Sequence, residues 1–180
     1  MEHSLKKQLA ALGYTPSSIK FLAMSHLHGD HSGNANDYSA ATWIVQKAER
    51  EFMFGSNLPA NIRPEEYAGL KTSESMVING DHDVFGDGSV TLIATPGHTP
   101  GHQSLLLQLP KTGAVLLTGD LYHFPGERSF HSMPEREKSL GTPASREKVE
   151  ALVSSRHAQL WIQHDSVNYA KLKRAPSFYD

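Results

Sequence analysis

The stretch MSHLHGDHSGN, residues 24–34, crowds three histidines and one aspartate into six positions. These residues are His26, His28, Asp30 and His31. An apolar run, IKFLAMS (residues 19–25), leads directly into the stretch and is typical of a buried strand. The ligand-rich segment is therefore predicted to be a loop at the end of a strand, where a rigid sheet commonly presents functional groups.

The composition limits the kinds of protein this chain can be. Its 180 residues have the length of one domain, 1–180, and 38% of them are hydrophobic and 20% charged, as in ordinary globular proteins. The net charge of −2 gives no reason to expect nucleic acid or an anionic membrane as a partner, and no apolar stretch is long enough to span a membrane. Because cysteine is absent, any metal must be held by imidazole and carboxylate, which suits zinc, iron, manganese or cobalt.

The rest of the chain mixes helical and strand patterns. Helices are predicted at residues 3–12, 47–55 and 142–155, where apolar residues recur at helical spacing or a glycine ends the segment. Further strands are predicted at residues 41–46, 89–95, 104–109, 114–119 and 160–163. Residues 56–76, rich in Pro, Asn and Glu, are predicted to be irregular or partly helical.

Four of the predicted strands end in a histidine or an aspartate. The strand ends are Ser25-His26, Thr95-Pro96-Gly97-His98, Thr118-Gly119-Asp120 and Gln163-His164. If the strands lie side by side, these groups converge at one edge of a sheet, as in a metal site built on a rigid scaffold. Gly97 and Gly101 are expected to allow tight turns with positive φ beside it.

The spacing divides the donors into two sets. A tight His-x-His-x-Asp-His loop can aim its first two imidazoles at one ion and its Asp-His pair at a second. The first set is then His26, His28 and His98, and the second is Asp30, His31 and His164. Asp120 can bridge the two ions, because a carboxylate has two oxygens. Hydrolytic two-metal sites hold their ions about 3.5–4 Å apart, close enough for one hydroxide to bridge them.

The remaining six histidines are expected to be surface residues or satisfied core residues rather than metal ligands. They are His3, His82, His102, His123, His131 and His157.

Four segments in this order, SHLHGDHSGN, TPGHTPGHQS, TGD and QHD, resemble the metallo-β-lactamase fold superfamily. The resemblance implies an αββα sandwich, in the α/β (α+β) class, with the metals at one edge of the paired sheets. It also implies the two ligand sets above, with Asp120 as the bridge. His102, the second histidine of GHTPGH, is then expected to support the ligands rather than to bind a metal.

Within the superfamily, the stretches SHLHGDHSGN, IVQKAE, HQSLLL and VLLTGD look most like the N-acyl homoserine lactone lactonases. The resemblance implies two divalent ions, zinc first, and a bridging hydroxide that attacks the lactone carbonyl and so quenches a quorum signal. It implies that Asp30 can also carry a proton to the leaving alkoxide. In these lactonases a tyrosine shortly after the bridging aspartate binds the carbonyl. Tyr122 is the candidate, although the lactonase pattern places the tyrosine one residue later, and plain packing is the alternative.

Residues 121–137 depart from the lactonase pattern. Their Pro, Gly and aromatic residues suggest a loop that flanks the site and influences substrate preference. His123 and His131 in this loop are expected to be solvated, with contact to a substrate as the alternative.

Two other functions remain open: a related esterase, glyoxalase II-like thioesterase or other hydrolase, and a metal-binding fragment without activity. The first histidine of the cluster usually follows several strands in the superfamily but stands at position 26 here, so the sandwich is expected to be incomplete at its N-terminus. Taken as written, the chain is expected in the cytoplasm, or in the periplasm or outside the cell if a signal segment precedes it. A homodimer is left open.

Overall fold

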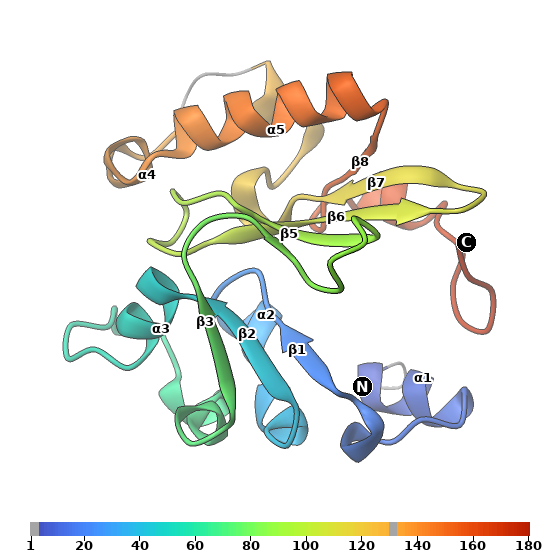
Figure 1. Cartoon of the computed structure of the whole chain (residues 1–180). Helices are drawn as coiled ribbons and strands as arrows, with labels where there is room; N and C mark the ends of the chain where they lie inside the picture. The colour runs from blue at the N-terminus through green and yellow to red at the C-terminus, as the bar shows by residue number, and fades with distance from the viewer. Residues whose placement is uncertain (1–3, 130–132) are drawn as a thin grey trace.

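The computed structural model describes residues 4–129 and 133–180, which form two β-sheets (Figure 1). The first sheet is parallel, has the order β1-β2-β3 and consists of β1 (Phe21–Ala23), β2 (Thr42–Gln46) and β3 (Ser75–Ile78). The second has the order β4-β5-β6-β7-β8. It consists of β4 (His82–Asp83), β5 (Val90–Ala94), β6 (Gln103–Leu109), β7 (Gly113–Leu117) and β8 (Gln159–Trp161). Its pairs are antiparallel except for β7 and β8.

The helices of the described residues are short, apart from α5. The α-helices are α1 (Leu5–Ala11), α2 (Gly29–Ser32), α3 (Lys47–Met53), α4 (Glu135–Leu140), α5 (Thr142–Arg156) and α6 (Ser166–Tyr169). The 3₁₀ helices are η1 (Pro16–Ser18), η2 (Ala35–Tyr38), η3 (Pro64–Glu66), η4 (Ala68–Lys71), η5 (Gly119–Leu121) and η6 (Pro125–Arg128).

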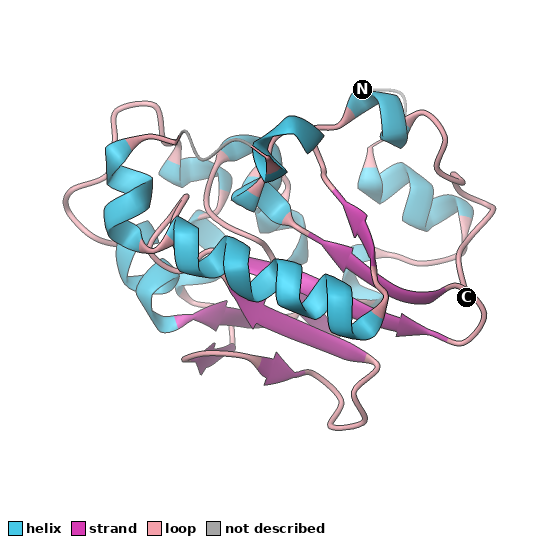
Figure 2. Cartoon of the chain, turned by 90° about the horizontal axis from the view of Figure 1, so that it is seen from above, coloured by secondary structure: helices cyan, strands magenta, loops and turns pink. Residues whose placement is uncertain are grey.

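Each sheet packs its outer face against helices and has its own hydrophobic core. Helix α5 lies across the strands of the second sheet (Figure 2). Alternate residues of these strands face it, including Ile93, Leu106 and Leu116, which pack with Val149 of α5. The first sheet packs instead against α3 and the 3₁₀ helices, through a cluster that includes Trp43, Val45, Met53, Tyr67 and Leu70. The layers are therefore helix, sheet, sheet and helix.

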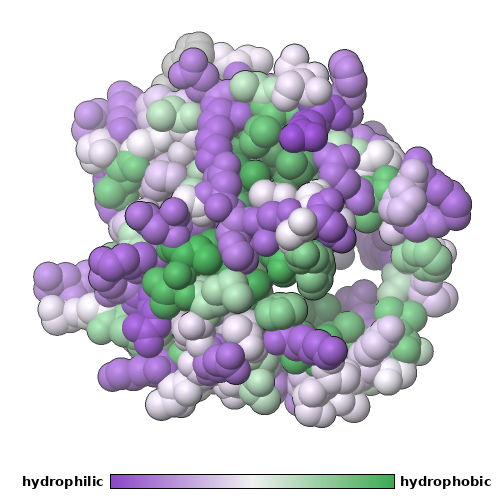
Figure 3. Space-filling model, in the orientation of Figure 1, coloured by the Kyte–Doolittle hydropathy of each residue, from purple (hydrophilic) through white to green (hydrophobic). Residues whose placement is uncertain are grey.

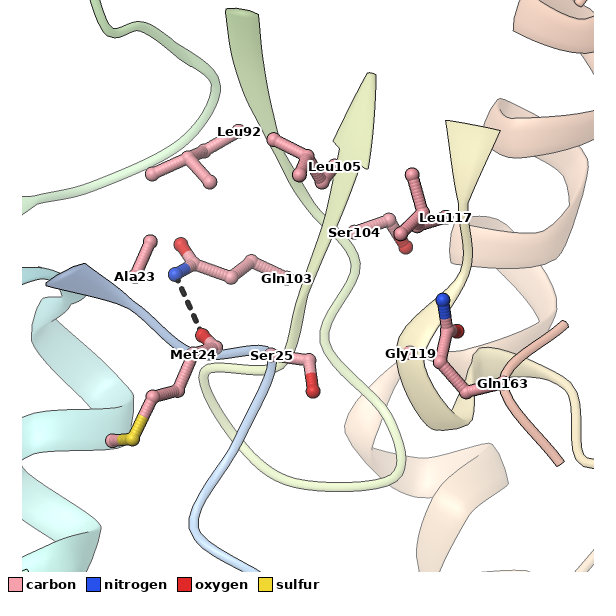
Figure 4. Close-up of a pocket in the computed structure, with 10 residues that line it drawn as sticks. All are labelled: Ala23, Met24, Ser25, Leu92, Gln103, Ser104, Leu105, Leu117, Gly119 and Gln163. Carbon is pink, nitrogen blue, oxygen red and sulfur yellow. Dashed lines mark hydrogen bonds between the residues drawn. The ribbon is translucent and has the colours of Figure 1, made fainter. Parts of the chain in front are cut away.

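The inner faces of the two sheets line a partly open cavity of about 170 Å³. Figure 4 shows its lining, with Leu92, Leu105 and Leu117 from the second sheet opposite Ala23 and Met24 at the end of β1. Hydrogen bonds join the two sheets just before His26. Gln103 Nε2 donates to the Met24 carbonyl at 2.9 Å, and the Gln103 amide donates to the Ser25 carbonyl at 3.0 Å.

Hydrophobic residues also reach the surface around the junction of the two sheets (Figure 3). Met76, Val77, Phe21 and Phe85 are all exposed, and the rings of Phe21 and Phe85 contact each other edge to face at 6.1 Å.

The structure corrects two local expectations and adds one strand. Residues 19–25 were expected to form a buried strand, but β1 has only three residues, lies at the edge of its sheet, and leaves Phe21 41% exposed. Residues 56–76 contain η3 and η4, in agreement with a partly helical segment, but β3, which begins at Ser75, was not expected because it is too short to stand out in the pattern. Gly97 has the expected positive φ of +154°, whereas Gly101 does not have a positive φ.

Gly101 is needed for a different reason, which is close packing. A Cβ atom at this position would lie 2.2 Å from the backbone nitrogen of Glu49, well inside contact distance. The loop after β5 can therefore approach the first turn of α3 only with glycine here.

This close packing predicts that Gly101→Ala lowers the free energy of unfolding by about 3 kcal/mol, because the added methyl group forces backbone apart in a packed interior. Gly113→Ala is the control, since Gly113 has φ +82° with open space around its Cβ position. It is expected to cost about 1–2 kcal/mol through backbone strain alone. Urea unfolding of both variants measures the difference, and a Gly101→Ala variant no less stable than Gly113→Ala would contradict the packing argument.

Candidate metal centre

The strand ends meet at one edge of the two sheets. β5, β7 and β8 run in the same direction, because β6 lies antiparallel to β5 and β7, and β7 is parallel to β8. Their carboxyl ends therefore deliver His98, Asp120 and His164 to one edge of the second sheet. The end of β1 faces this edge and supplies the segment from His26 to His31. The structure thus brings together all seven residues that the sequence selected, in two groups.

The first group gathers on one oxygen of Asp120. It consists of His26, His28, His98 and Asp120. Nδ1 of His28 lies 2.8 Å from His26 Nε2 and 2.9 Å from His98 Nε2. Oδ2 of Asp120 lies 3.6 Å from His26 Nε2 and 3.5 Å from His98 Nε2.

The second group gathers on the other oxygen. It consists of Asp30, His31 and His164. Oδ1 of Asp120 lies 3.1 Å from His31 Nε2 and 3.2 Å from His164 Nε2. The same two nitrogens lie 3.5 and 3.3 Å from Asp30 Oδ2. The Asp120 carboxylate therefore stands between the groups with one oxygen toward each.

The donor set fits divalent metal ions. Ligand atoms about 2.1 Å from a tetrahedral ion are about 3.4 Å from each other, close to most of the separations above. Oδ1 of Asp120 is buried and accepts no hydrogen bond of normal geometry from the described residues, although two imidazole nitrogens are close to it. An acceptor in that position costs free energy unless a cation or proton satisfies it.

The electrostatics of the cluster also suit a metal. Burial, the largest cause, holds the pKa of His26 far below its usual value and lowers the pKa of His28 and of His98. These rings are therefore neutral and keep a nitrogen lone pair for coordination. Burial acts to raise the pKa of Asp120, but the surrounding histidines, His123 and His31 first, outweigh it and hold that pKa well below its usual range.

The ligand-type residues are themselves held by outer hydrogen bonds, as metal-binding histidines commonly are. Ser25 Oγ lies 3.1 Å from His26 Nδ1 and 3.0 Å from His31 Nδ1, so one hydroxyl contacts both groups. Glu137 Oε1 lies 3.3 Å from His98 Nδ1. Sequence reasoning missed Glu137, because α4 carries no motif and reaches the site only through the tertiary fold.

His102 supports the cluster without belonging to either group. It is fully buried, and its Nε2 accepts a hydrogen bond from the Asp120 amide at 3.0 Å. Its Nδ1 lies 3.1 Å from the Thr95 carbonyl, which fixes the proton on Nδ1. Burial lowers the pKa of His102 to about 3, so the ring is neutral and can both donate and accept. The expectation of a supporting role agrees with these contacts.

The structure directs Tyr122 away from the cluster. Its side chain is buried, its hydroxyl lies 3.1 Å from Glu150 Oε1, and the guanidinium of Arg146 covers its ring. His123 is the residue that faces the cluster. Its Nε2 lies 3.6 Å from Asp120 Oδ2, and its side chain is 37% exposed, so it is not an ordinary solvated loop histidine.

The other four histidines are separate from the cluster or outside the described residues. His82 lies in β4 and His157 caps the C-terminus of α5, and neither is in the two groups. The expectations for His3 and His131 concern positions outside the residues described.

The sequence pattern of the metallo-beta-lactamase superfamily matches residues 1–158. The chain belongs to this superfamily. The match and the helix-sheet-sheet-helix layers confirm the predicted fold class, and the family together with the His/Asp cluster implies that the chain binds divalent metal.

Similar proteins carry lactonase names. The chain is 35% identical over 182 residues to the N-acyl homoserine lactonase AttM of Azorhizobium caulinodans, which covers 96% of this chain and 68% of the relative. It is 41% identical over 115 residues to the N-acyl homoserine lactonase of Bacillus cereus, covering 62% of this chain and 42% of the relative. The resemblance to the lactonases stated above is therefore confirmed.

A solved structure of an N-acyl homoserine lactone hydrolase, with the product N-hexanoyl-L-homoserine bound at its catalytic metal centre, superimposes with a TM-score of 0.83. The sequence identity is 27%, and the match covers 98% of this chain and 67% of that one.

Within the described residues, no helix is long and apolar enough to cross a membrane.

The His102 contacts predict that His102→Phe lowers the free energy of unfolding by about 2–4 kcal/mol, because the ring is kept but a buried donor and a buried acceptor lose their partner. His157→Ala is the control, since His157 is exposed at the end of α5. Guanidinium unfolding measures both. A loss within about 0.5 kcal/mol for His102→Phe would be the range of an ordinary surface change and would contradict the supporting role.

Proposed function

We propose that this chain is a metal-dependent hydrolase that opens the lactone ring of N-acyl homoserine lactones, and that residues 1–180 act as one hydrolase domain. The observation that carries the proposal is the pair of donor groups that share the two oxygens of Asp120, in a chain whose relatives are N-acyl homoserine lactonases. Ring opening would inactivate a quorum-sensing signal.

In this proposal the cluster would hold two divalent ions, zinc in the first place, with iron, manganese or cobalt as alternatives. His26, His28 and His98 would hold one ion, and Asp30, His31 and His164 would hold the other. Asp120, which turns one oxygen toward each group, would serve both. When bound, such ions supply Lewis-acid chemistry: they acidify water and polarise a carbonyl oxygen.

The chain's own residues orient the substrate and move the proton. Water adds across the ester bond of the lactone, so that its oxygen joins the carbonyl carbon, the ring C–O bond breaks and one proton ends on the released hydroxyl. In this proposal Asp30 carries that proton, a role supported by its side chain, which is 58% exposed and adjoins His31 and His164. His123, at the open side of the cluster, is placed to donate a hydrogen bond to the substrate carbonyl.

The substrate assay tests the proposal directly. Purified chain, loaded with zinc, is expected to hydrolyse N-acyl homoserine lactones with a kcat/KM at least tenfold above that for S-lactoylglutathione or a phosphotriester. Lactones of several acyl-chain lengths should be included. No turnover of any lactone, or a clear preference for the thioester, would overturn the lactonase assignment.

Metal analysis tests the two donor sets separately. Wild-type chain is expected to retain two zinc ions after dialysis, and His26→Ala and His164→Ala are each expected to retain about one, because each removes a ligand from a different set. His157→Ala is the control and should keep two. Retention of both ions in either ligand variant, or less than one ion in the wild type, would refute the dinuclear site.

Different effects on kcat are expected for variants of His123 and Tyr122. His123→Ala is expected to lower kcat by about 10²-fold, because a donor aimed at developing charge contributes roughly that much. Tyr122→Phe is expected to change kcat less than twofold and to cost about 1 kcal/mol of stability through the lost contact with Glu150. Steady-state kinetics and thermal unfolding of both variants measure this, and the reverse pattern would return the catalytic role to Tyr122.

A further inference from the structure

Glu49 is a buried carboxylate that the proposed chemistry does not use. It lies in the first turn of α3, directly after β2, and is only 3% exposed. A buried carboxylate is costly unless hydrogen bonds or a cation satisfy it. What Glu49 contacts therefore indicates why it is there.

Both oxygens of Glu49 accept hydrogen bonds from other parts of the chain. Oε1 accepts from the Leu27 amide at 2.9 Å. Oε2 accepts from the Thr99 hydroxyl at 2.7 Å and from the Gly101 amide at 3.0 Å. Burial raises the pKa of Glu49, and these three hydrogen bonds oppose the shift because they favour the charged form.

The three groups that donate hydrogen bonds to Glu49 belong to the two loops that carry the histidines of the first donor group, His26, His28 and His98. Residues 24–34, here the first ligand loop, hold Leu27 between His26 and His28. Residues 96–102, here the second ligand loop, hold Thr99 directly after His98. The Glu49 carboxylate thus bonds to both loops. It does so beside His28, whose Nδ1 lies 2.8 Å from His26 Nε2 and 2.9 Å from His98 Nε2.

We propose that Glu49 is a positioning residue whose carboxylate holds the two ligand loops in the register that brings His26 and His28 to His98. The inference rests on the metal centre of the proposed function. In this inference Glu49 strengthens metal binding by the first donor group and takes no part in the reaction itself.

The chemistry of the contacts requires a carboxylate. A glutamine has one acceptor oxygen, so its amide nitrogen would have to face either the Leu27 amide or the donors of the second ligand loop. Either arrangement puts N–H against N–H and releases one loop from the other. Gly101 is required for the same arrangement, because a Cβ atom at this position would collide with the backbone of Glu49.

The experiment compares Glu49→Gln with a chemically matched control. Asp83 is also a carboxylate that accepts backbone hydrogen bonds, from the amides of Gly86 and Gly88 at 3.0 and 2.7 Å, but it lies at the end of β4, outside both ligand loops. Asp83→Asn therefore makes the same chemical change elsewhere. Zinc dissociation constants come from chelator competition, and visible absorption of the cobalt-loaded chain reports ligand geometry. Amide exchange at Leu27 and Gly101 is followed in zinc-free protein.

Glu49→Gln is expected to raise the zinc dissociation constant tenfold or more, the usual scale for an outer partner of a ligand set, and to shift the cobalt spectrum. The Leu27 and Gly101 amides should exchange at least tenfold faster. Asp83→Asn is expected to leave the zinc dissociation constant within about twofold, whatever its effect on melting. Thr99→Val, which removes one hydroxyl and keeps the shape of the side chain, is expected to raise it about threefold to tenfold.

Unchanged zinc affinity in both Glu49→Gln and Thr99→Val would overturn the inference and leave Glu49 a structural residue only. If Glu49→Gln does not fold, Thr99→Val decides by the same criterion. The proposed function fails separately: wild-type chain that binds zinc in a Glu49-dependent way but opens no lactone would support the positioning role and overturn the substrate. A wild-type chain that binds no zinc would overturn both.

Discussion

Seven side chains of metal-ligand type point at one another in this structure, although their lone pairs do not attract. Such groups gain little from each other around a buried carboxylate, so the arrangement has to be held from outside. Contacts to the Nδ1 atoms of the histidine rings hold them in place. Ser25 contacts His26 and His31, and Glu137 contacts His98. These outer contacts orient the ligand-type side chains, which is what a rigid binding site requires.

The layered fold explains why these supports gather at one edge. Each sheet packs its outer hydrophobic face against its own helices, and a cavity lies between the sheets. Gln103 donates hydrogen bonds to the Met24 and Ser25 carbonyls, and Glu49 accepts hydrogen bonds from both ligand loops. Several bonds that join the sheets therefore also hold the loops that carry the site, so a change that breaks them would loosen both.

Apolar strands that end in His or Asp allowed the convergence of these groups at one sheet edge to be predicted, and the two-sheet architecture was predicted from the resemblance to the superfamily. The sequence did not reveal Glu137 or Glu49. Their partners are backbone amides and ring nitrogens distant in the chain, and only the tertiary fold brings them together. The strand β3 was also missed, because four residues, Met76 and Val77 among them exposed, carry too little pattern.

The choice between Tyr122 and His123 depends on the direction in which the chain leaves β7. After this strand the backbone turns through η5, which ends at Leu121, and is extended at Tyr122. Because side chains alternate along extended backbone, neighbouring residues there point to opposite sides. His123 faces Asp120 and the cluster, whereas Tyr122 points away, toward Glu150 of α5. Tyr122 packs against α5 and holds the turn, while His123 stays partly exposed beside the cluster. The packing of Tyr122 therefore determines which of the two side chains faces the cluster.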